Sequence, residues 1–213
     1  YTEYYRSVTN LIGNALFLEL RAIVNNGFVS VSYGDSRDIL QRTDADPDDP
    51  TKVILVYLGF SVKGAWDNGV TWNREHVWPQ SLLGVDVSNN HKGIGSDLHN
   101  LKPSNPNENN RKGNSYFANM SSSSTYEPRD EVKGDIARIV FYMYTKWSSL
   151  SLVDRAPSTY QMGLLSVLLS WHEQDPVDDF ERNRNDIIYT YQNNRNPYID
   201  YPEFVQMIWG DAS

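Results

Sequence analysis

Apolar residues recur along the chain at intervals of three and four positions, which is the pattern of amphipathic helices. The clearest set consists of Ile136, Ile139, Val140, Met143 and Trp147. A second set predicts a helix over Leu11–Val24 that ends at Asn25-Asn26-Gly27. The same reasoning predicts helices over Tyr33–Arg42, Gly163–His172 and Asp178–Tyr191. We expect these apolar faces to form the core rather than a cofactor pocket.

Strand-forming sequence is confined to short segments between the helices. Lys52–Phe60 and Thr71–Trp78 are rich in β-branched and aromatic residues, and Pro79 ends the second of them. Leu98–Leu101 is a third, shorter candidate. Because no linker divides the chain, we predict a single domain over residues 1–213. Its fold class is α+β, mainly helical and with a small β-sheet.

Composition narrows the class of protein. Of the 213 residues, 39% are hydrophobic and 22% are charged, which excludes a disordered polyelectrolyte. No apolar run approaches the ~18 residues that cross a bilayer, so we expect no membrane partner. Cys is absent, which excludes a disulfide scaffold, a thiolate zinc site and a cysteine nucleophile. Because the chain starts at Tyr1 instead of Met, we expect that a leader was removed or the chain trimmed, as in a secreted protein.

The overall charge argues against a nucleic-acid partner, but its distribution weakens that argument. With 19 Lys and Arg against 27 Asp and Glu, the net charge is −8. Residues 73–114 nevertheless carry a net charge of +1, and three of the four His residues lie there. The basic residues of this window are Arg74, Lys92, Lys102, Arg111 and Lys112. A polyanion can therefore meet a locally basic groove on an otherwise acidic protein.

The same window contains a strand, a long connection, a second strand and a helix start. Glu75 and His76 are adjacent in the first predicted strand. The segment Asn105-Pro106-Asn107-Glu108 begins with a capping Asn, has Pro at the first helical position and ends with a Glu that can complete a capping box. Asn109 then lies one turn inside that helix. One His, one Glu and one Asn are thus available to converge.

These residue types suit the hydrolysis of a phosphodiester bond. A neutral imidazole can take a proton from water near pH 7, which makes His76 the candidate general base. Mg²⁺ prefers oxygen ligands and retains several waters, so Glu75 and Asn109 are the candidate metal ligands. Successive residues of a regular strand point to opposite faces, so Glu75 and His76 can share one site only if the strand bends. We therefore predict irregular backbone between Arg74 and Pro79.

Less specific interpretations stay open beside this one. A single His is more often packed or exposed than catalytic, and we expect His99 to form a hydrogen bond in the core and His91 to lie in solvent. A zinc hydrolase that uses His76, His99 and His172 is a second hypothesis, although their spacing matches no standard zinc signature. A non-catalytic nucleic-acid-binding module is a third.

Three segments resemble the endonuclease I family of secreted or periplasmic bacterial nucleases. They are Trp72–Ser81 (WNREHVWPQS), Ser96–Ser104 (SDLHNLKPS) and Asn109–Asn114 (NNRKGN). The resemblance extends over most of the chain and implies a ββα-metal (His-Me finger) active site at about residues 71–117. Residue by residue, it implies that His76 is the general base and that Glu75 and Asn109 bind the metal.

One feature of the family pattern is missing from this chain. The family holds the cleaved phosphate with an Arg from the long connection, and here Gln80–Gly95 contains no Arg. Lys92 is the nearest substitute for that Arg, with Arg74 or Arg111 as alternatives. The other expected substrate contacts are Arg74, Arg111 and Lys112.

The resemblance thus implies a metal-dependent, largely sequence-nonspecific endonuclease that acts on DNA, with RNA as a second substrate. The implied products carry 5′-phosphate and 3′-hydroxyl ends. The implied cofactor is Mg²⁺, with Mn²⁺ or Ca²⁺ as alternatives, and we expect a secreted or periplasmic monomer. An extracellular ribonuclease of the same family is the alternative activity.

Overall fold

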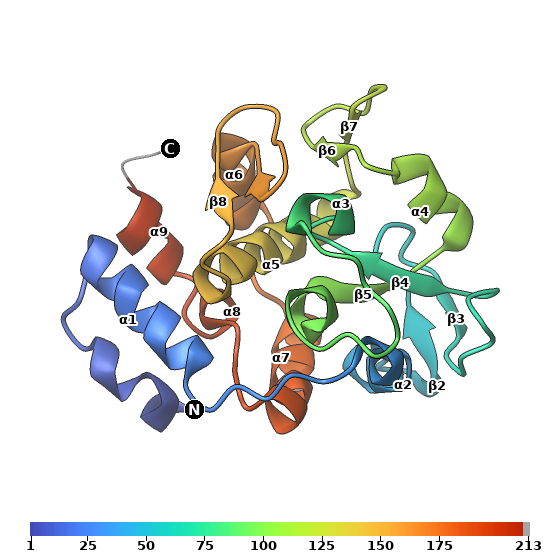
Figure 1. The fold of residues 1–213 in the computed structure, drawn as a ribbon, viewed down its shortest axis with the longest axis horizontal. Helices are drawn as coiled ribbons and strands as arrows, with labels where there is room; N and C mark the ends of the chain where they lie inside the picture. The colour runs from blue at the N-terminus through green and yellow to red at the C-terminus, as the bar shows by residue number, and fades with distance from the viewer. Residues whose placement is uncertain (211–213) are drawn as a thin grey trace.

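Helix α5 (Lys133–Lys146) runs through the centre of the molecule in the computed structural model, which describes residues 1–210 (Figure 1). The apolar residues that predicted this helix, from Ile136 to Met143, are buried on it. Helices α1 (Gly13–Asn25), α6 (Leu165–Gln174) and α8 (Pro197–Asp200) pack against it. In Figure 1, α1 and α9 lie on one side of α5, and β2 to β5 with α4 lie on the other.

The other helices are shorter or lie outside this centre. They are α2 (Tyr33–Thr43), α3 (Gln80–Leu83), α4 (Pro106–Lys112), α7 (Asp179–Gln192) and α9 (Phe204–Trp209), with 3-10 helices η1 (Thr2–Val8), η2 (Ile94–Ser96), η3 (Leu98–Asn100) and η4 (Asp130–Val132). Most apolar side chains buried between them belong to one core that surrounds α5.

The β-structure consists of small, separate sheets. Strands β1 (Ala45–Asp46), β2 (Asp49–Ile54) and β3 (Ser61–Lys63) form an antiparallel sheet. The other pairs are β4 (Asn73–His76) with β5 (Leu101–Ser104), β6 (Tyr116–Phe117) with β7 (Thr125–Tyr126), and β8 (Ser151–Leu152) with β9 (Gln161–Met162). A second, smaller core packs β2, β4, β5, α2 and α7 together; its centre includes Leu40, Val53, Trp72, Leu98 and Leu101. The predicted α+β class is therefore confirmed.

The strand predicted at Leu98–Leu101 is wrong. Leu98–Asn100 is a 3-10 turn, and the strand begins only at Leu101. The turn forms because the Asp97 carboxylate accepts a hydrogen bond from the backbone N–H of His99 at 3.1 Å. Pro103 does not stop the strand. Among the described strands only β4 pairs with β5, the Pro103 carbonyl accepts a hydrogen bond from the Val56 N–H at 2.9 Å, and Pro is tolerated in such an edge strand.

The helices predicted over 163–172 and 178–191 exist with shifted ends. The first begins at Leu165 and the second ends at Gln192. Of the predicted run Lys52–Phe60, only the first three residues are strand, at the end of β2. The chain turns after Ile54 and returns as β3, which begins at Ser61. Within residues 1–210, none of the helices combines the length and the apolar character that crossing a bilayer requires.

Candidate active site

Strands β4 and β5 and helix α4 form a strand–strand–helix unit around the predicted residues. The strands are antiparallel, and Glu75 lies opposite Lys102 while His76 lies opposite Leu101. The Asn105 side chain caps α4 by accepting a hydrogen bond from the backbone N–H of Glu108 at 3.0 Å. The capping box is only half formed, because the Glu108 carboxylate binds Arg111 instead. The unit places Glu75 and His76 on β4 and Asn109 on α4.

The imidazole of His76 is held in one orientation. Its Nε2 lies 2.8 Å from the carbonyl oxygen of Gly95, and its ring stacks on Tyr33 with 5.4 Å between ring centroids. A carbonyl oxygen only accepts hydrogen bonds, so Nε2 carries the proton and Nδ1 keeps its lone pair. Burial lowers the pKa of His76 to about 4, against the weaker opposing effect of the Gly95 carbonyl. The ring is therefore neutral at pH 7 and able to accept a proton at Nδ1.

The Gly95 carbonyl is itself positioned by a residue that we did not predict to matter. The backbone N–H of Gly95 donates to Nε2 of His91 at 3.0 Å, so His91 is partly buried instead of lying freely in solvent. A Cβ at position 95 would clash with Val87 and press on His91, which explains the Gly there. In the sequence, the only sign of this contact is that two Gly residues, Gly93 and Gly95, follow His91 closely.

The Glu75 carboxylate is buried, with 6% of the residue exposed. Its Oε2 accepts a hydrogen bond from the Tyr57 hydroxyl and lies 3.4 Å from Nζ of Lys112. Burial raises the pKa of Glu75, and the Lys112 ammonium opposes that effect. Tyr57, in the turn after β2, is a contact that sequence reasoning missed. Both of these contacts are made by Oε2, so Oε1 is the oxygen of Glu75 that we expect to bind a further ligand.

Lys112 lies inside the protein rather than on its surface. Only 1% of the residue is exposed, and its ammonium lies 4.9 Å from the centroid of the Phe117 ring. Its observed contact is with Glu75, so it compensates the charge of that carboxylate. The substrate contact expected for Lys112 stays a prediction, and this burial does not favour it.

Glu75 and His76 lie on opposite faces of β4. The strand pairs in regular register from Asn73 through His76, and the chain bends only at Val77 and Trp78. The prediction of irregular backbone is therefore wrong for the residues before Val77. In the described part of the chain, β5 is the one strand that pairs with β4, so the opposite edge of β4 has no strand partner. The bend that a shared site requires is therefore absent between Glu75 and His76, and their convergence on one ligand stays a prediction.

Asn109 lies near the Glu75 face of the strand. Its Nδ2 donates to Oδ1 of Asn73 at 2.9 Å, and Asn73 is two residues before Glu75, on the same face. This hydrogen bond orients the amide and leaves Oδ1 of Asn109 as an acceptor. A carboxylate oxygen and an amide oxygen are the donors that a hard divalent cation prefers, so these residues fit such a cation chemically.

The four predicted cationic contacts have different environments. The half-buried Arg74 guanidinium lies 3.7 Å from the Tyr33 ring centroid, on the same strand face as His76. Lys92 is exposed and its backbone pairs with Ser32, next to Tyr33. Arg111 forms two hydrogen bonds to Glu108 at 2.6 and 3.1 Å. Arg74 and Lys92 are thus linked to His76 through Tyr33 or its neighbour Ser32, whereas Arg111 is bound to Glu108.

The zinc-hydrolase hypothesis is wrong. His99 is buried and contacts Asn194 and Tyr142, and His172 contacts Arg138 and the Pro202 carbonyl. Among the residues that the structure describes, the only group of three or more side chains spaced for a metal consists of Asp135, Asp178 and Glu181. This acidic group could hold a metal ion, but it includes no His.

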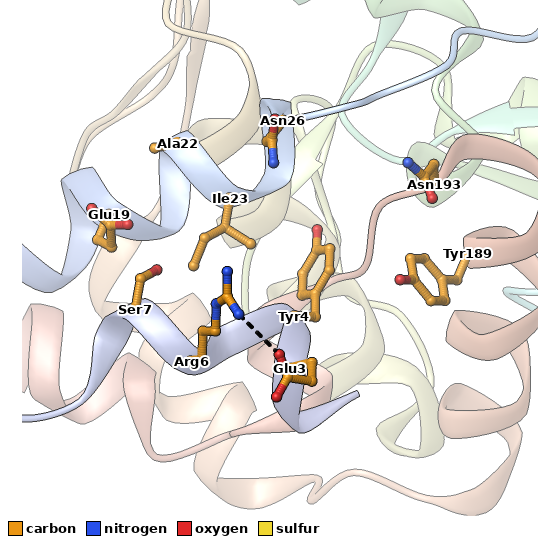
Figure 2. Close-up of a pocket in the computed structure, with 10 residues that line it drawn as sticks. All are labelled: Glu3, Tyr4, Arg6, Ser7, Glu19, Ala22, Ile23, Asn26, Tyr189 and Asn193. Carbon is orange, nitrogen blue, oxygen red and sulfur yellow. Dashed lines mark hydrogen bonds and ion pairs between the residues drawn. The ribbon is translucent and has the colours of Figure 1, made fainter.

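A separate pocket lies away from this motif, between η1, α1 and the end of α7 (Figure 2). Its volume is about 610 Å³, and it contains none of the predicted site residues. Arg6, which lines it, is paired with Glu3 at 3.2 Å. With Glu19 also in its wall, the pocket offers little attraction for a polyanion.

Comparison with known proteins identifies the chain as a nuclease. The family model of Endonuclease I matches residues 13–203. Two relatives named extracellular ribonuclease, from Bacillus amyloliquefaciens and from Bacillus subtilis (strain 168), are each 40% identical over 228 aligned positions. Each alignment covers 97% of this chain and 78% of the relative. The chain belongs to the Endonuclease I family, as the three sequence segments indicated, and its substrate is nucleic acid.

Proposed function

We propose that this protein is a metal-dependent, largely sequence-nonspecific endonuclease that hydrolyses RNA as well as DNA. The observation that carries the proposal is the hydrogen bond from His76 Nε2 to the Gly95 carbonyl at 2.8 Å. This bond fixes the neutral tautomer whose free Nδ1 can accept a proton from water. The names of the two ribonuclease relatives support RNA as a substrate.

The residues divide the work of hydrolysis as follows. His76 takes a proton from the attacking water through Nδ1, while Tyr33 and Gly95 keep the ring in place. Glu75 Oε1 and Asn109 Oδ1 would hold a divalent cation, with Mg²⁺ the first candidate and Mn²⁺ or Ca²⁺ as alternatives. When bound there, such an ion stabilises negative charge on the phosphate and on the leaving 3′ oxygen. The products then carry 5′-phosphate and 3′-hydroxyl ends.

The substrate backbone is bound by cations that surround His76. Arg74 shares a strand face with His76 and is held against Tyr33, and Lys92 is exposed with its backbone paired to Ser32, the residue before Tyr33. We assign these two residues, ahead of Arg111, to the phosphates on either side of the cleaved bond. Contacts to phosphate carry no base information, which accounts for cleavage with little sequence preference.

The proposed site needs no residue from a second chain, which supports action as a monomer. All of the groups named above come from residues 33 to 109. The relatives are named extracellular, which supports secretion.

A substrate and metal panel tests the proposal. Supercoiled plasmid and a structured RNA are each incubated with the protein in Mg²⁺, in excess chelator, and in chelator followed by excess Mg²⁺. We expect both substrates to be cut in Mg²⁺, both to survive in chelator, and cleavage to return when Mg²⁺ is restored. Cleavage that persists in chelator contradicts metal dependence. Gel shifts without cleavage favour the non-catalytic binding module, and cleavage of RNA alone removes DNA from the proposal.

A further inference from the structure

Three acidic side chains meet far along the chain from the catalytic motif, where α5 and α7 begin. Asp135 lies in the first turn of α5, Asp178 caps α7 and Glu181 lies in the first turn of α7. One oxygen from each lies within 4.8 Å of the other two. We propose that Asp135, Asp178 and Glu181 bind a structural calcium ion, separate from the catalytic cation. Oxygen atoms at 2.3–2.6 Å from Ca²⁺ are separated by up to about this distance.

An unpaired carboxylate oxygen inside the protein points to a missing ligand. Oδ1 of Asp135 is buried and forms no hydrogen bond with the residues that the structure describes, and only 5% of Asp135 is exposed. It lies 3.9 Å from Nη2 of Arg138, beyond hydrogen-bond range, and that same nitrogen is 2.6 Å from Oε1 of Glu181. Oδ1 of Asp135 is therefore directed toward the Glu181 carboxylate. A buried acceptor without a partner is costly, and a bound cation would satisfy it.

Carboxyl groups outnumber cationic groups in the cluster, and burial, followed by the nearby Asp135 carboxylate, raises the pKa of Glu181. Arg138 contacts Glu181 through two hydrogen bonds, at 2.7 and 2.6 Å. Asp175 adds a fourth carboxylate, whose Oδ2 accepts a hydrogen bond from the Gly134 N–H at 2.8 Å. Among the described residues, the cluster thus contains four carboxyl groups and one guanidinium, that of Arg138.

The neighbouring imidazole does not supply the missing charge. His172 faces Arg138 Nη1 with Nδ1 at 3.1 Å and faces the Pro202 carbonyl with Nε2 at 3.0 Å. Nδ1 accepts from the guanidinium and Nε2 donates to the carbonyl, so the ring is the neutral tautomer. A divalent cation at the three carboxylates would supply the charge that His172 does not.

Calcium fits this place better than magnesium. The site is formed by carboxylate oxygens alone, and Asp178 is exposed, so water can complete a coordination shell of six to eight ligands. Mg²⁺ requires shorter bonds and near-octahedral geometry, and it is rarely held by a site made of protein ligands alone. The ion would link the first turns of α5 and α7 in a chain that has no Cys for a disulfide.

Thermal unfolding with a matched pair of variants tests the calcium site. Asp178→Asn keeps the oxygen that caps α7, where Oδ1 accepts from the Glu181 N–H at 2.9 Å, but removes the charge. Asp179→Asn makes the same change one residue later, at an exposed side chain that pairs only with the surface residue Arg182. In chelator-treated parent protein and in Asp179→Asn, we expect Ca²⁺ at about 100 times its Kd to raise Tm by on the order of 5 °C. In Asp178→Asn and Asp135→Asn this shift should be lost.

The catalytic site also binds divalent ions, so its contribution must be separated. Calorimetric titration of Asn109→Ala with Ca²⁺ should still show one ion bound per chain, and addition of Asp178→Asn should remove it. Equal Tm shifts in Asp178→Asn and Asp179→Asn would overturn the proposal and leave the cluster as carboxylates stabilised by helix N-termini. Loss of all calcium binding in Asn109→Ala would overturn it as well, because the ion would then sit only at the catalytic site. Neither result depends on nuclease activity, so failure here is distinct from failure of the proposed function.

Discussion

Replacing His76 with Ala is expected to lower the single-turnover rate of RNA and plasmid cleavage by about 10²–10⁴, the usual contribution of a positioned general base. The imidazole is neutral, its Nε2 is bound to the Gly95 carbonyl, and its Nδ1 has a free lone pair. Removing it leaves the attacking water without a proton acceptor, while Glu75 and Asn109 are unchanged. Rates are measured with enzyme in excess over substrate, so that product release does not mask the chemical step.

The control for this variant is added imidazole. A free base that enters the space left by the ring should restore part of the rate in His76→Ala and none in the parent protein. Thermal unfolding of both proteins shows whether the loss of the contact with Tyr33 has disturbed the fold. A folded His76→Ala protein that cuts at the parent rate contradicts the assignment of His76 as the base.

Replacing Glu75 with Gln is expected to reduce cleavage by at least the same factor of about 10²–10⁴, and high Mg²⁺ should recover part of it. Gln can still accept the Tyr57 hydrogen bond, but it removes the charged oxygen proposed to hold the cation. It also leaves the buried Lys112 ammonium without its carboxylate, which lowers the free energy of unfolding. The rate is measured as a function of Mg²⁺ concentration, and stability is measured separately by denaturant unfolding.

Glu108→Gln is the matched control. Glu108 is also largely buried and is also bound by a Tyr hydroxyl and a cationic side chain, Tyr126 and Arg111. The same chemical change there should leave the rate within a few fold of the parent and its Mg²⁺ dependence unaltered. If both Glu variants lose activity equally, the effect of Glu75 belongs to the fold and not to the cation.

The elements that the sequence predicted well are those determined by local pattern. The apolar spacing from Ile136 to Met143 predicts a helix, and α5 forms there. The structure buries α5 on nearly all sides, however, and not on one face alone. The start of α4 depends on Asn105 and the residues next to it, and its cap forms as expected. The assignment of Glu75, His76 and Asn109 depended on their order in a short motif, which the fold keeps within one strand–strand–helix unit.

The features that the sequence did not predict depend on contacts between distant segments. Leu98–Asn100 is a turn because Asp97 is held by Tyr142, Trp147 and Gln192, which lie 45 to 95 residues away in the chain. The burial of Lys112 requires its pairing with Glu75 from another element. No local spacing contains such information.

Two hydrogen bonds at the site, between Tyr57 and Glu75 and between Gly95 and His91, were not predicted for the same reason. Tyr57 reaches Glu75 from the turn after β2, and His91 fixes the carbonyl that orients His76. Neither Tyr57 nor His91 was predicted as a site residue, because both act through contacts with segments distant in the chain or through the backbone. They are the residues to test next, once His76 and Glu75 have been measured.

The cleaved ends formed in oxygen-18 water test the central claim most directly, namely that an activated water attacks phosphorus and the 3′ oxygen leaves. A base such as His76 could equally activate the 2′-hydroxyl of RNA, and only the products separate the two routes. Mass spectrometry of RNA and DNA fragments should show 5′-phosphates that contain one oxygen-18 atom, together with unlabelled 3′-hydroxyl ends. Fragments that end in a 2′,3′-cyclic phosphate or a 3′-phosphate would contradict the account.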